Sequence, residues 1–357
     1  MYIEILKLRY FRNYTAAELE FSPLTNIIYG NNAQGKTNIL EAVYLFSQGR
    51  SHRAKTDKEL VKFGCDFASI GAEFSDSERK HIANMHITEN GRKCVSVNHI
   101  SITKLSRLMN YLNVVMFSPE DLDLVKSSPN VRRRFIDSAI SQLSPAYMAS
   151  LMEYNKVLKQ KNSLLKKGEK ALKTLEVWNI QLSELIVKIT NAREEFTKSI
   201  GEFAHSIQMD ISKENLLIEY LPNIKIENFT AENVLDFLNG HREREIYQGA
   251  ALYGVQRDDL RIFVNGNEAK LFASQGQQRT CALSMKIAQS EYINSIKGEY
   301  PVLLLDDIMS ELDINRRMYL SERIKDKQVL ITSTDTDISE KNTSTKLFKI
   351  HNGKVVG

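Results

Sequence analysis

The sequence of 357 residues contains few cysteines and no long apolar segment. Its three cysteines, Cys65, Cys94 and Cys281, do not stand at metal-ligand spacing from one another or from a histidine, which argues against a disulfide framework and a structural zinc site. No window approaches the roughly 20 apolar residues that a membrane helix needs, so we expect no membrane partner. Residues 1–8 alternate like a strand and lack the apolar core of a secretory signal, so we expect a cytoplasmic protein.

A strong charge of either sign is also missing. The formal net charge is +4 and the isoelectric point is about 8.7, which permits nucleic-acid binding without requiring it. The length is sufficient for two domains, or for one large domain with an insertion. The sequence shows no internal repeat, zinc finger, groove-reading helix or RNP-type aromatic pattern, so we do not expect sequence-specific recognition of nucleic acid.

The most informative segment that is present is residues 30–37, which read G-N-N-A-Q-G-K-T and match the phosphate-binding loop G-x-x-x-x-G-K-[ST] at every fixed position. The apolar run 24–29 predicts a strand before the loop, and residues 38–45 predict an amphipathic helix after it. In such a loop the backbone N–H groups surround phosphates, Lys36 reaches the β and γ oxygens, and the Thr37 hydroxyl binds Mg²⁺. The alternative is a glycine-rich turn that matches the motif by chance. The candidate nucleotide-binding residues of this segment are Gly30, Asn31, Asn32, Ala33, Gln34, Gly35, Lys36, Thr37 and Asn38.

A second part of the same site is predicted far downstream. The apolar run 301–305 is followed by Asp306 and Asp307, the form of a Walker B strand. The first acid is expected to hold Mg²⁺ and the second to orient or deprotonate the attacking water, so Lys36, Asp306 and Asp307 are the candidate catalytic residues. Alternatively, a buried strand simply ends here in two solvated acids. Because roughly 270 positions separate Lys36 from Asp306, we expect a large insertion between them.

A second anion site is predicted at residues 274–279, S-Q-G-Q-Q-R, which open an apolar-periodic helix over 280–296. A helix N-terminus has N–H groups without intrahelical partners and a positive macrodipole end. Since the loop 30–37 already surrounds the phosphates, we expect this helix to serve the nucleotide bound by a second copy of the chain. The alternative is that Ser274 is only the N-cap of its helix.

These segments, together with S-E-L-D at 310–313 and the segments 6–14, 49–53, 117–122 and 257–260, resemble those of the RecF family within the SMC and RecF group of ABC-type ATPases. The likeness extends over essentially the whole chain. It implies an α/β fold: an ABC-type ATPase head, with a P-loop and a mixed sheet with helices, and an inserted, mainly helical lobe with a short antiparallel coiled-coil hairpin. We predict the head at residues 1–118 and 250–357 and the inserted lobe at 119–249.

The resemblance also implies a function in DNA repair and replication and in the SOS response. It implies binding of ATP and Mg²⁺, an ATP-dependent homodimer, binding of DNA at single-strand gaps and duplex junctions, and weak DNA-stimulated ATP hydrolysis. RecO and RecR would be partners in loading RecA onto single strands coated with single-strand-binding protein. Two alternatives stay open, a non-hydrolysing ATP-switched DNA clamp and an SMC-like structural DNA-binding protein. A transporter subunit is disfavoured by the inserted hairpin and by a missing switch histidine.

The resemblance assigns further residues to the site. Arg12 and Asn13 would contact the nucleotide, and Ser310 and Asp313 would belong to a D-loop at the dimer seam. The signature residues that would act on the partner's γ-phosphate are Ser274, Gln275, Gly276 and Gln277.

The sequence departs from the pattern of its relatives at three places. Asp307 stands where many ABC ATPases have glutamate, which fits slow turnover. The position of the switch histidine falls near Thr334. Val255 and Gln256 stand where we expect Pro-His, which leaves the role of the adjacent Arg257 open.

Residues 144–208 predict a helical hairpin with a polar turn near Gly168. It is either an arm that helps to hold DNA or two helices packed on the head. The predicted heptad seam of the second arm is Leu175, Trp178, Leu182, Leu185, Ile189, Ala192 and Phe196, and Lys161 is expected to interrupt the seam of the first arm. Basic residues in and before the hairpin are candidates for sequence-independent contacts with DNA phosphates, although such clusters are usually solvated faces. These candidates are Arg132, Arg133, Arg134, Lys159, Lys161, Lys166, Lys167, Lys170 and Lys173.

Overall fold

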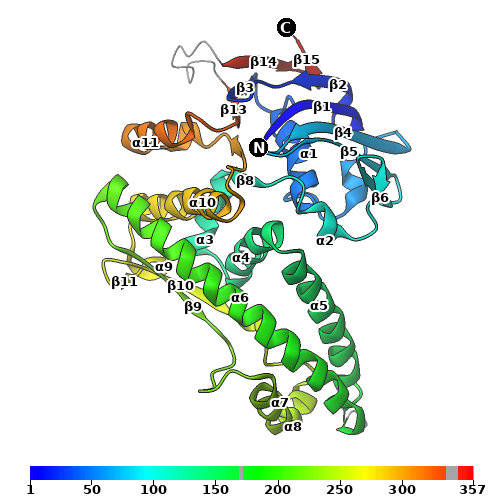
Figure 1. The fold of residues 1–357 in the computed structure, drawn as a ribbon, viewed down its shortest axis with the longest axis vertical. Coiled ribbons are helices and arrows are strands. Elements are labelled where there is room, and N and C mark those ends of the chain that lie inside the picture. The colour runs from blue at the N-terminus through cyan, green and yellow to red at the C-terminus, as the bar shows by residue number, and fades with distance from the viewer. Residues whose placement is uncertain (169–171, 335–344, 357) are drawn as a thin grey trace. The chain divides into compact units, whose positions relative to one another are not determined.

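The computed structural model describes residues 1–168, 172–334 and 345–356 (Figure 1). The chain forms two compact units. Unit 1 comprises Met1–Leu122, Asp210–Lys213 and Ala282–Gly357, and unit 2 comprises Asp123–Met209 and Glu214–Cys281. Among the described residues, no helix combines the length and the apolar character needed to cross a membrane.

An antiparallel sheet makes up one part of unit 1, with the strand order β2-β1-β4-β5-β6-β7. Along β4 and β5 every second residue is buried, which is the alternation of a sheet with one face on a core. The turn at Asn90–Gly91 joins two antiparallel strands of this sheet, β5 and β6. Its strands are β1 (Tyr2–Phe11), β2 (Tyr14–Glu20), β4 (Phe67–Ser75), β5 (Lys80–Thr88), β6 (Lys93–Val97) and β7 (Ile100–Ser101).

The second sheet of unit 1 has the order β15-β14-β3-β13-β12-β8, and its neighbours pair in parallel except at β14 and β15. β8 and β13 are buried along their whole length, as expected for parallel strands that are covered on both faces. Parallel strands bring their carboxyl ends to one edge, where ligand sites of open α/β sheets lie. The strands are β3 (Thr25–Tyr29), β8 (Val114–Phe117), β12 (Val302–Asp306), β13 (Val329–Ser333), β14 (Lys346–His351) and β15 (Lys354–Val355).

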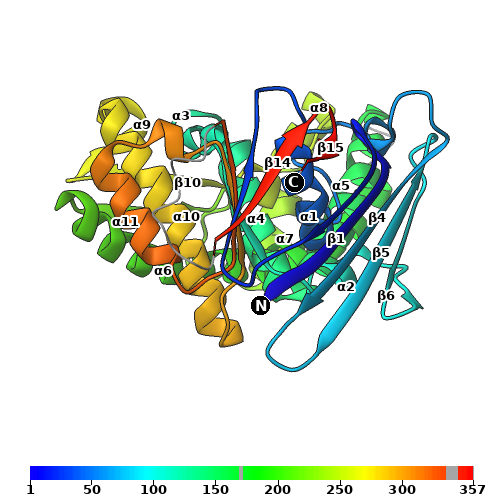
Figure 2. The ribbon, with the colours of Figure 1, turned by 90° about the horizontal axis from the view of Figure 1, so that it is seen from above.

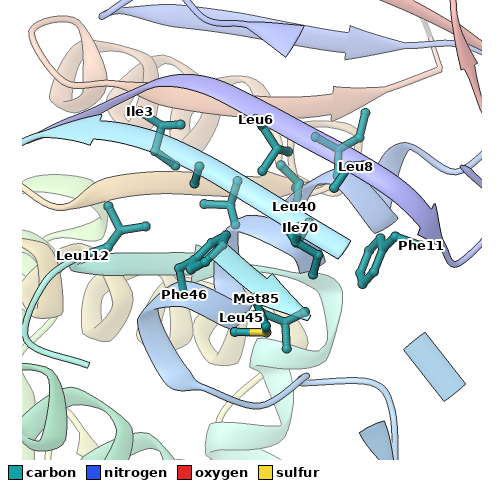
Figure 3. Packing of buried hydrophobic residues seen from close by; sticks show 14 of the residues in the cluster. Ile3, Leu6, Leu8, Phe11, Leu40, Leu45, Phe46, Ile70, Met85 and Leu112 are labelled. Carbon is teal, nitrogen blue, oxygen red and sulfur yellow. The ribbon is translucent and has the colours of Figure 1, made fainter. Parts of the chain in front are cut away.

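Helix α1 (Lys36–Gln48) packs between the two sheets of unit 1, and Figures 1 and 2 both show it beside β1 and β4. Figure 3 shows Leu40, Leu45 and Phe46 of this helix in one cluster with Leu6 of β1 and Ile70 of β4. These side chains are at most 1% exposed, and each such burial stabilises the fold by about 1.5–3 kcal/mol. The core thus fixes the helix that follows the predicted phosphate loop. The other helices of unit 1 are α2 (Leu105–Leu108) and α11 (Ile314–Ile324), with the 3₁₀ turns η1 (Asp57–Leu60), η2 (Pro119–Leu122) and η5 (Met309–Glu311).

Unit 2 is mainly helical and includes the predicted hairpin, formed by α5 (Pro145–Leu165) and α6 (Leu172–Ser212). A three-stranded sheet of order β11-β10-β9 pairs β9 (Leu216–Leu221) with β10 (Asp259–Val264), and β10 with β11 (Asn267–Glu268). Because of this pairing, residues 259–281 belong to the same compact unit as the inserted lobe. The boundary that the sequence predicts at residue 250 assigns them to the head instead. The remaining elements are α3 (Asp123–Lys126), α4 (Pro129–Leu143), α7 (Ala231–Gly240), α8 (Arg242–Gln248), the turn η4 (Val255–Arg257), α9 (Ala269–Phe272) and α10 (Gln275–Lys297), whose residues from 282 onward belong to unit 1.

The buried face of α6 differs from the predicted heptad seam. Ile186 and Arg193 are buried, whereas the predicted Leu185 and Ala192 are only half-buried, because a straight helix drifts away from a strict 3.5-residue repeat. Lys161 is not the solvated residue that an interruption of the first arm would require. It is fully buried, and its Nζ lies 2.7 Å from Oε2 of Glu245. Its proposed contact with DNA is therefore wrong.

Candidate nucleotide-binding site

The predicted phosphate loop runs from the end of β3 into α1, as the sequence pattern requires. Gly35 is the N-cap of α1 with φ of 109°, a backbone conformation that favours glycine. A Cβ atom at Gly35 would lie 2.5 Å from the side-chain amide of Asn13, so the loop has no room for a larger residue here. The first turn of α1 contains no acidic residue, which leaves its N–H groups available to an anion.

Lys36 reaches back across the loop. Its Nζ donates hydrogen bonds to the carbonyl oxygens of Gly30, at 2.5 Å, and Asn31, at 3.0 Å. Burial lowers the pKa of Lys36, while Asp307 and Asp306 act in the opposite direction. An ammonium group held by two neutral carbonyls can exchange them for phosphate oxygens, which carry more negative charge.

The two distant halves of the predicted site meet at Asp306. The Thr37 hydroxyl donates to Asp306 Oδ1 at 2.8 Å, and the Thr332 hydroxyl donates to the same oxygen at 2.7 Å. The Thr332 hydroxyl in turn accepts a hydrogen bond from the backbone N–H of Asp307 at 3.0 Å. β12 and β13 are neighbours in the parallel sheet, which explains why residues so far apart in sequence meet here.

The oxygen atoms around Asp306 fit the preferences of Mg²⁺. A carboxylate and a hydroxyl are hard donors, and magnesium in nucleotide sites takes one or two such protein ligands and completes its shell with phosphate and water. In the described part of the chain, no group of three or more His, Cys, Asp or Glu side chains could hold a metal ion by itself. A magnesium ion held by Thr37 and Asp306 therefore requires nucleotide and water oxygens as its other ligands.

Asp307 has a strained backbone, with φ of 52°. A non-glycine residue in this region costs on the order of 1–3 kcal/mol, and such strain is concentrated at functional sites. Its side chain is exposed, and the predicted D-loop residue Ser310 donates its hydroxyl to the Asp307 carbonyl at 2.8 Å and to Oδ1 at 3.3 Å. Two residues that the sequence assigns to separate motifs thus contact each other.

Asn13 supports the loop from the neighbouring strand turn. Its Nδ2 donates to the Gln34 carbonyl at 2.8 Å, and its Oδ1 accepts from Asn38 at 2.9 Å. The Tyr14 hydroxyl donates to the Gly35 carbonyl at 3.0 Å. The exposed residues of the loop are Asn31, Asn32 and Ala33. The structure thus places Asn13 and Asn38 beside the loop, and it adds Tyr14, which the sequence did not indicate.

Arg12 lies beside Asn13 and has three of its nitrogen atoms bound to protein oxygens. Nε and Nη2 donate to the two carboxylate oxygens of Glu41, at 2.7 and 2.6 Å, and Nη1 donates to the Glu59 carbonyl at 2.9 Å. Glu41 is fully buried on α1. Although burial opposes ionisation, hydrogen bonds from Arg12 and Ser51 hold the pKa of Glu41 below its ordinary value.

Glu41 and Thr332 are further members of the site that the sequence motifs did not indicate. A signal exists for each. Glu41 is a charged residue among the apolar positions of α1, and Thr332 is a polar residue near the end of the apolar strand β13. At Thr334, where the sequence predicts the position of the switch residue, the structure has an exposed threonine.

The predicted signature opens α10, and the Ser274 hydroxyl accepts a hydrogen bond from the Gln277 backbone N–H at 3.2 Å. The Gln277 side chain accepts from the Ser274 N–H at 2.8 Å and donates to Glu214 at 2.7 Å. This is a reciprocal capping arrangement, so Ser274 is the N-cap of its helix, as the alternative interpretation predicts. The capping contact does not bear on a role toward a second copy. Ser274 and Gln275 are exposed, while Gly276 is half-buried and its carbonyl accepts from Thr280 at 3.0 Å.

The remaining predicted residues, in the D-loop and in the basic clusters, either make contacts within the protein or are exposed. Asp313 is the N-cap of α11 and accepts from the Arg316 N–H at 3.0 Å. Arg132 is buried and bound to both carboxylate oxygens of Asp259, at 2.6 and 2.9 Å, so its predicted contact with DNA is wrong. Arg133 is half-buried and donates to the Asp258 carbonyl at 2.6 Å. The candidates with exposed side chains are Arg134, Lys159, Lys166 and Lys167, while Lys170 and the side chain of Lys173 lie outside the described part of the chain.

Residues 2–355 match the family described as the RecF/RecN/SMC N terminal domain. The DNA replication and repair protein RecF of Staphylococcus epidermidis (strain ATCC 35984) is 42% identical over 371 aligned residues, and the protein of the same name from Staphylococcus carnosus (strain TM300) is 43% identical over 370. Both alignments cover 100% of this chain and 100% of the relative.

Solved structures of similar fold point to the same family. A structure of the recombination mediator protein RecF with ATP, described as part of the RecFOR pathway, matches with a TM-score of 0.92 at 33% identity over 99% of this chain and 97% of the other. The Smc head domain from Pyrococcus furiosus, bound to the C-terminal domain of ScpA, matches with a TM-score of 0.57 at 18% identity over 99% of this chain and 96% of the other, a likeness of fold alone. These matches confirm the predicted ABC-type head fold with mixed sheets and a helical insertion. Because the family match and the curated relatives extend over the full chain, the protein belongs to the RecF family of DNA replication and repair proteins.

Proposed function

We propose that this protein is an ATP-dependent recombination mediator that dimerises on gapped DNA and hydrolyses ATP slowly. The observation that carries this proposal is the 2.8 Å hydrogen bond between Thr37 and Asp306, which joins the phosphate loop to the Walker B acids within one site. The relative with a TM-score of 0.92 was solved with ATP, which supports the choice of nucleotide.

In this proposal the loop 30–37 binds the triphosphate through its backbone N–H groups, and Lys36 binds the β and γ phosphates. Thr37 and Asp306 hold Mg²⁺, which when bound reduces the negative charge of the phosphates. Asp307 accepts a proton from the water that attacks the γ-phosphorus, and the bond to the β–γ bridging oxygen breaks to give ADP and phosphate. A short aspartate in place of glutamate holds this water less closely, so turnover is slow.

In this proposal, dimerisation depends on the exposed N-terminus of α10. We assign Ser274, Gly276 and Gln277 to the γ-phosphate bound by a second copy, so that each nucleotide is enclosed only in the dimer. The capping bond at Ser274 uses its hydroxyl as an acceptor and leaves the hydroxyl proton free to bind a phosphate oxygen. Asp313 and Ser310 then lie in the D-loop at the seam between the copies.

The remaining parts of the proposal derive from family membership. DNA with single-strand gaps and duplex junctions is the substrate, and RecO, RecR and RecA are the partners. The solved relative described as a recombination mediator in the RecFOR pathway supports this assignment. The exposed basic residues Arg134, Lys166 and Lys167 are proposed to contact DNA phosphates, and unit 2 is proposed to be the DNA-facing lobe.

Sedimentation with and without ATP and gapped DNA tests the proposal. We expect the wild-type chain to sediment as a dimer only with ATP, and Lys36→Ala to bind no ATP and to stay monomeric. The control Lys55→Ala removes an equal charge from an exposed position and should behave as the wild type. A Lys36→Ala chain that still dimerises with ATP would refute the proposal.

The Asp307→Asn variant separates this function from a non-hydrolysing clamp. If hydrolysis resets the protein, the variant should form an ATP-bound dimer that does not leave DNA. If the variant binds and leaves DNA as the wild type does, ATP acts only as a switch for dimerisation and the alternative is correct.

A further inference from the structure

A pocket of about 590 Å³ lies within unit 2 and has no residue in common with the nucleotide loop. It is formed by the N-terminal turn of α4, one side chain of α5 and the segment 250–257. None of its lining residues is acidic. The lining residues are Ser128, Pro129, Asn130, Arg133, Asn162, Ala250, Ala251, Gln256 and Arg257.

Among the described residues neither arginine of this pocket has a carboxylate within ion-pair distance, because the nearby Asp258 and Asp259 pair with Arg193 and Arg132. Arg133 is half-buried and donates to the Asp258 carbonyl at 2.6 Å, which satisfies a hydrogen bond but adds no opposing full charge. Burial and the neighbouring Arg193 lower the pKa of Arg133, while Asp258 and Asp259 act in the opposite direction. The exposed Arg257 adds a second positive charge to the same pocket.

The backbone that presents Arg257 is rigidly held. Gly254 has φ of 127°, and a Cβ atom there would lie 2.4 Å from the Tyr154 hydroxyl. Its N–H donates to Asn223 Oδ1 at 3.0 Å, and its carbonyl accepts from the Arg257 N–H at 3.0 Å. The buried Arg193 donates to the Val255 carbonyl at 2.8 Å. The backbone of Arg257 is therefore fixed beside the pocket, and only its exposed side chain remains to be ordered on binding.

The other polar groups of the pocket also suit an anion. The Asn162 Oδ1 accepts from the Ala251 N–H at 2.8 Å, so what this lining side chain can still offer a ligand is its N–H₂ donors. Ser128 is the N-cap of the 15-residue helix α4, and its side chain makes no capping bond to that helix. No acidic residue occupies the first turn of α4.

We propose that this pocket binds a phosphomonoester. A terminal phosphate carries a charge of about −1.5 to −2 at neutral pH, which matches two guanidinium groups, whereas a backbone phosphodiester carries only one negative charge. Arginine binds phosphate oxygens through two parallel hydrogen bonds, so two arginines can share the three terminal oxygens of a phosphomonoester. The identity of the ligand rests on the proposed function: it is the 5′-terminal phosphate of a DNA strand at the edge of a gap.

The first test compares gapped DNA that has a 5′-phosphate at the gap with the same DNA that has a 5′-hydroxyl. Fluorescence anisotropy with the full chain and ATP should show about tenfold tighter binding of the phosphorylated DNA, as expected for one charge-assisted contact. Arg257→Gln should abolish this preference. Arg242→Gln removes an equal charge from an exposed position outside the pocket and should keep it. Equal affinity of the wild type for both DNAs, or a preference that survives Arg257→Gln, refutes the proposal.

A second test separates the pocket from the proposed function. A 5′-phosphorylated trinucleotide is titrated by calorimetry into the Lys36→Ala chain, whose nucleotide loop cannot compete for phosphate. We expect binding that is lost without the 5′-phosphate and lost in the Lys36→Ala, Arg257→Gln double variant. If this binding occurs while gapped DNA is not bound at all, the pocket assignment holds and the proposed function is wrong. If the trinucleotide binds equally with and without its phosphate, the pocket assignment is wrong.

Discussion

The buried ion pair between Lys161 and Glu245 gives a quantitative prediction for unit 2. Both side chains are 0% exposed, and the Glu245 Oε1 also accepts from the Leu252 N–H at 2.8 Å. Lys161→Met removes the positive charge and leaves a buried carboxylate with only neutral partners. Loss of one member of a buried pair costs about 3–5 kcal/mol of unfolding free energy.

The double variant Lys161→Met, Glu245→Gln should regain at least about 2 kcal/mol of that loss. Its amide oxygen still accepts from Leu252, and no unpaired charge remains, because replacement of both ions by neutral groups of similar volume is often close to neutral. Urea unfolding followed by tryptophan fluorescence measures this difference. Trp178 is the only tryptophan of the chain and lies in unit 2, so the signal reports on this unit.

The pH dependence provides an independent check on the same pair. Burial lowers the pKa of Lys161 from its ordinary value near 10.5, and Glu245 only partly offsets this. Between the lowered pKa and 10.5 the unfolded chain binds more protons than the folded chain, so the Lys161 contribution to stability rises with pH in that window. The wild type should therefore gain stability relative to Lys161→Met as the pH rises toward 10. A double variant less stable than Lys161→Met, or a difference independent of pH, would refute this reasoning.

Further variants test the site and its surroundings. Ser274→Arg should bind ATP as the wild type does but should not dimerise, and an ATP-dependent dimer in ultracentrifugation would contradict the in-trans role. Thr332→Val should lower the ATP turnover about 10- to 100-fold with little change in ATP affinity, because one charge-assisted bond to Asp306 is lost, whereas Thr332→Ser should retain activity. Gly254→Ala should destabilise unit 2 by more than about 1 kcal/mol in the fluorescence assay, since alanine at this positive φ also meets the Tyr154 hydroxyl. Unchanged stability of that variant would show that the turn tolerates a side chain.

The continuous motifs of the site were predictable from the sequence. The loop 30–37 and the acids 306–307 each follow an apolar strand, and local patterns of this kind determine both the element and the residue that ends it. Thr332 and Glu41 were not found in this way. Thr332 bridges Asp306 and Asp307 only because β13 pairs with β12, and Glu41 meets Arg12 only because α1 packs beside β1. Contacts between distant segments leave no local pattern.

The wrong assignments of Arg132 and Lys161 have a different cause, because a cluster of charges does not show which face of its helix each cation occupies. Arg132 precedes Phe135, Ile136 and Ala139, which lie on the same buried face of α4. Lys161 follows Tyr154 and Val157 and precedes Leu165 on the buried face of α5. A basic residue at an apolar spacing is a candidate for a buried ion pair rather than for a surface contact.

Three helices of unit 2 each bury one cation against an acid of the short segment 245–259. Lys161 of α5 pairs with Glu245, Arg193 of α6 with Asp258, and Arg132 of α4 with Asp259. Buried ion pairs contribute little net stability compared with apolar groups of the same volume, but each tolerates only one arrangement of its partners. We therefore expect apolar replacement of all three pairs to preserve the folded state while loosening the segment 245–259. Because Gln256 and Arg257 reach the pocket from this segment, such a variant should lose the preference for 5′-phosphorylated DNA before it loses cooperative unfolding.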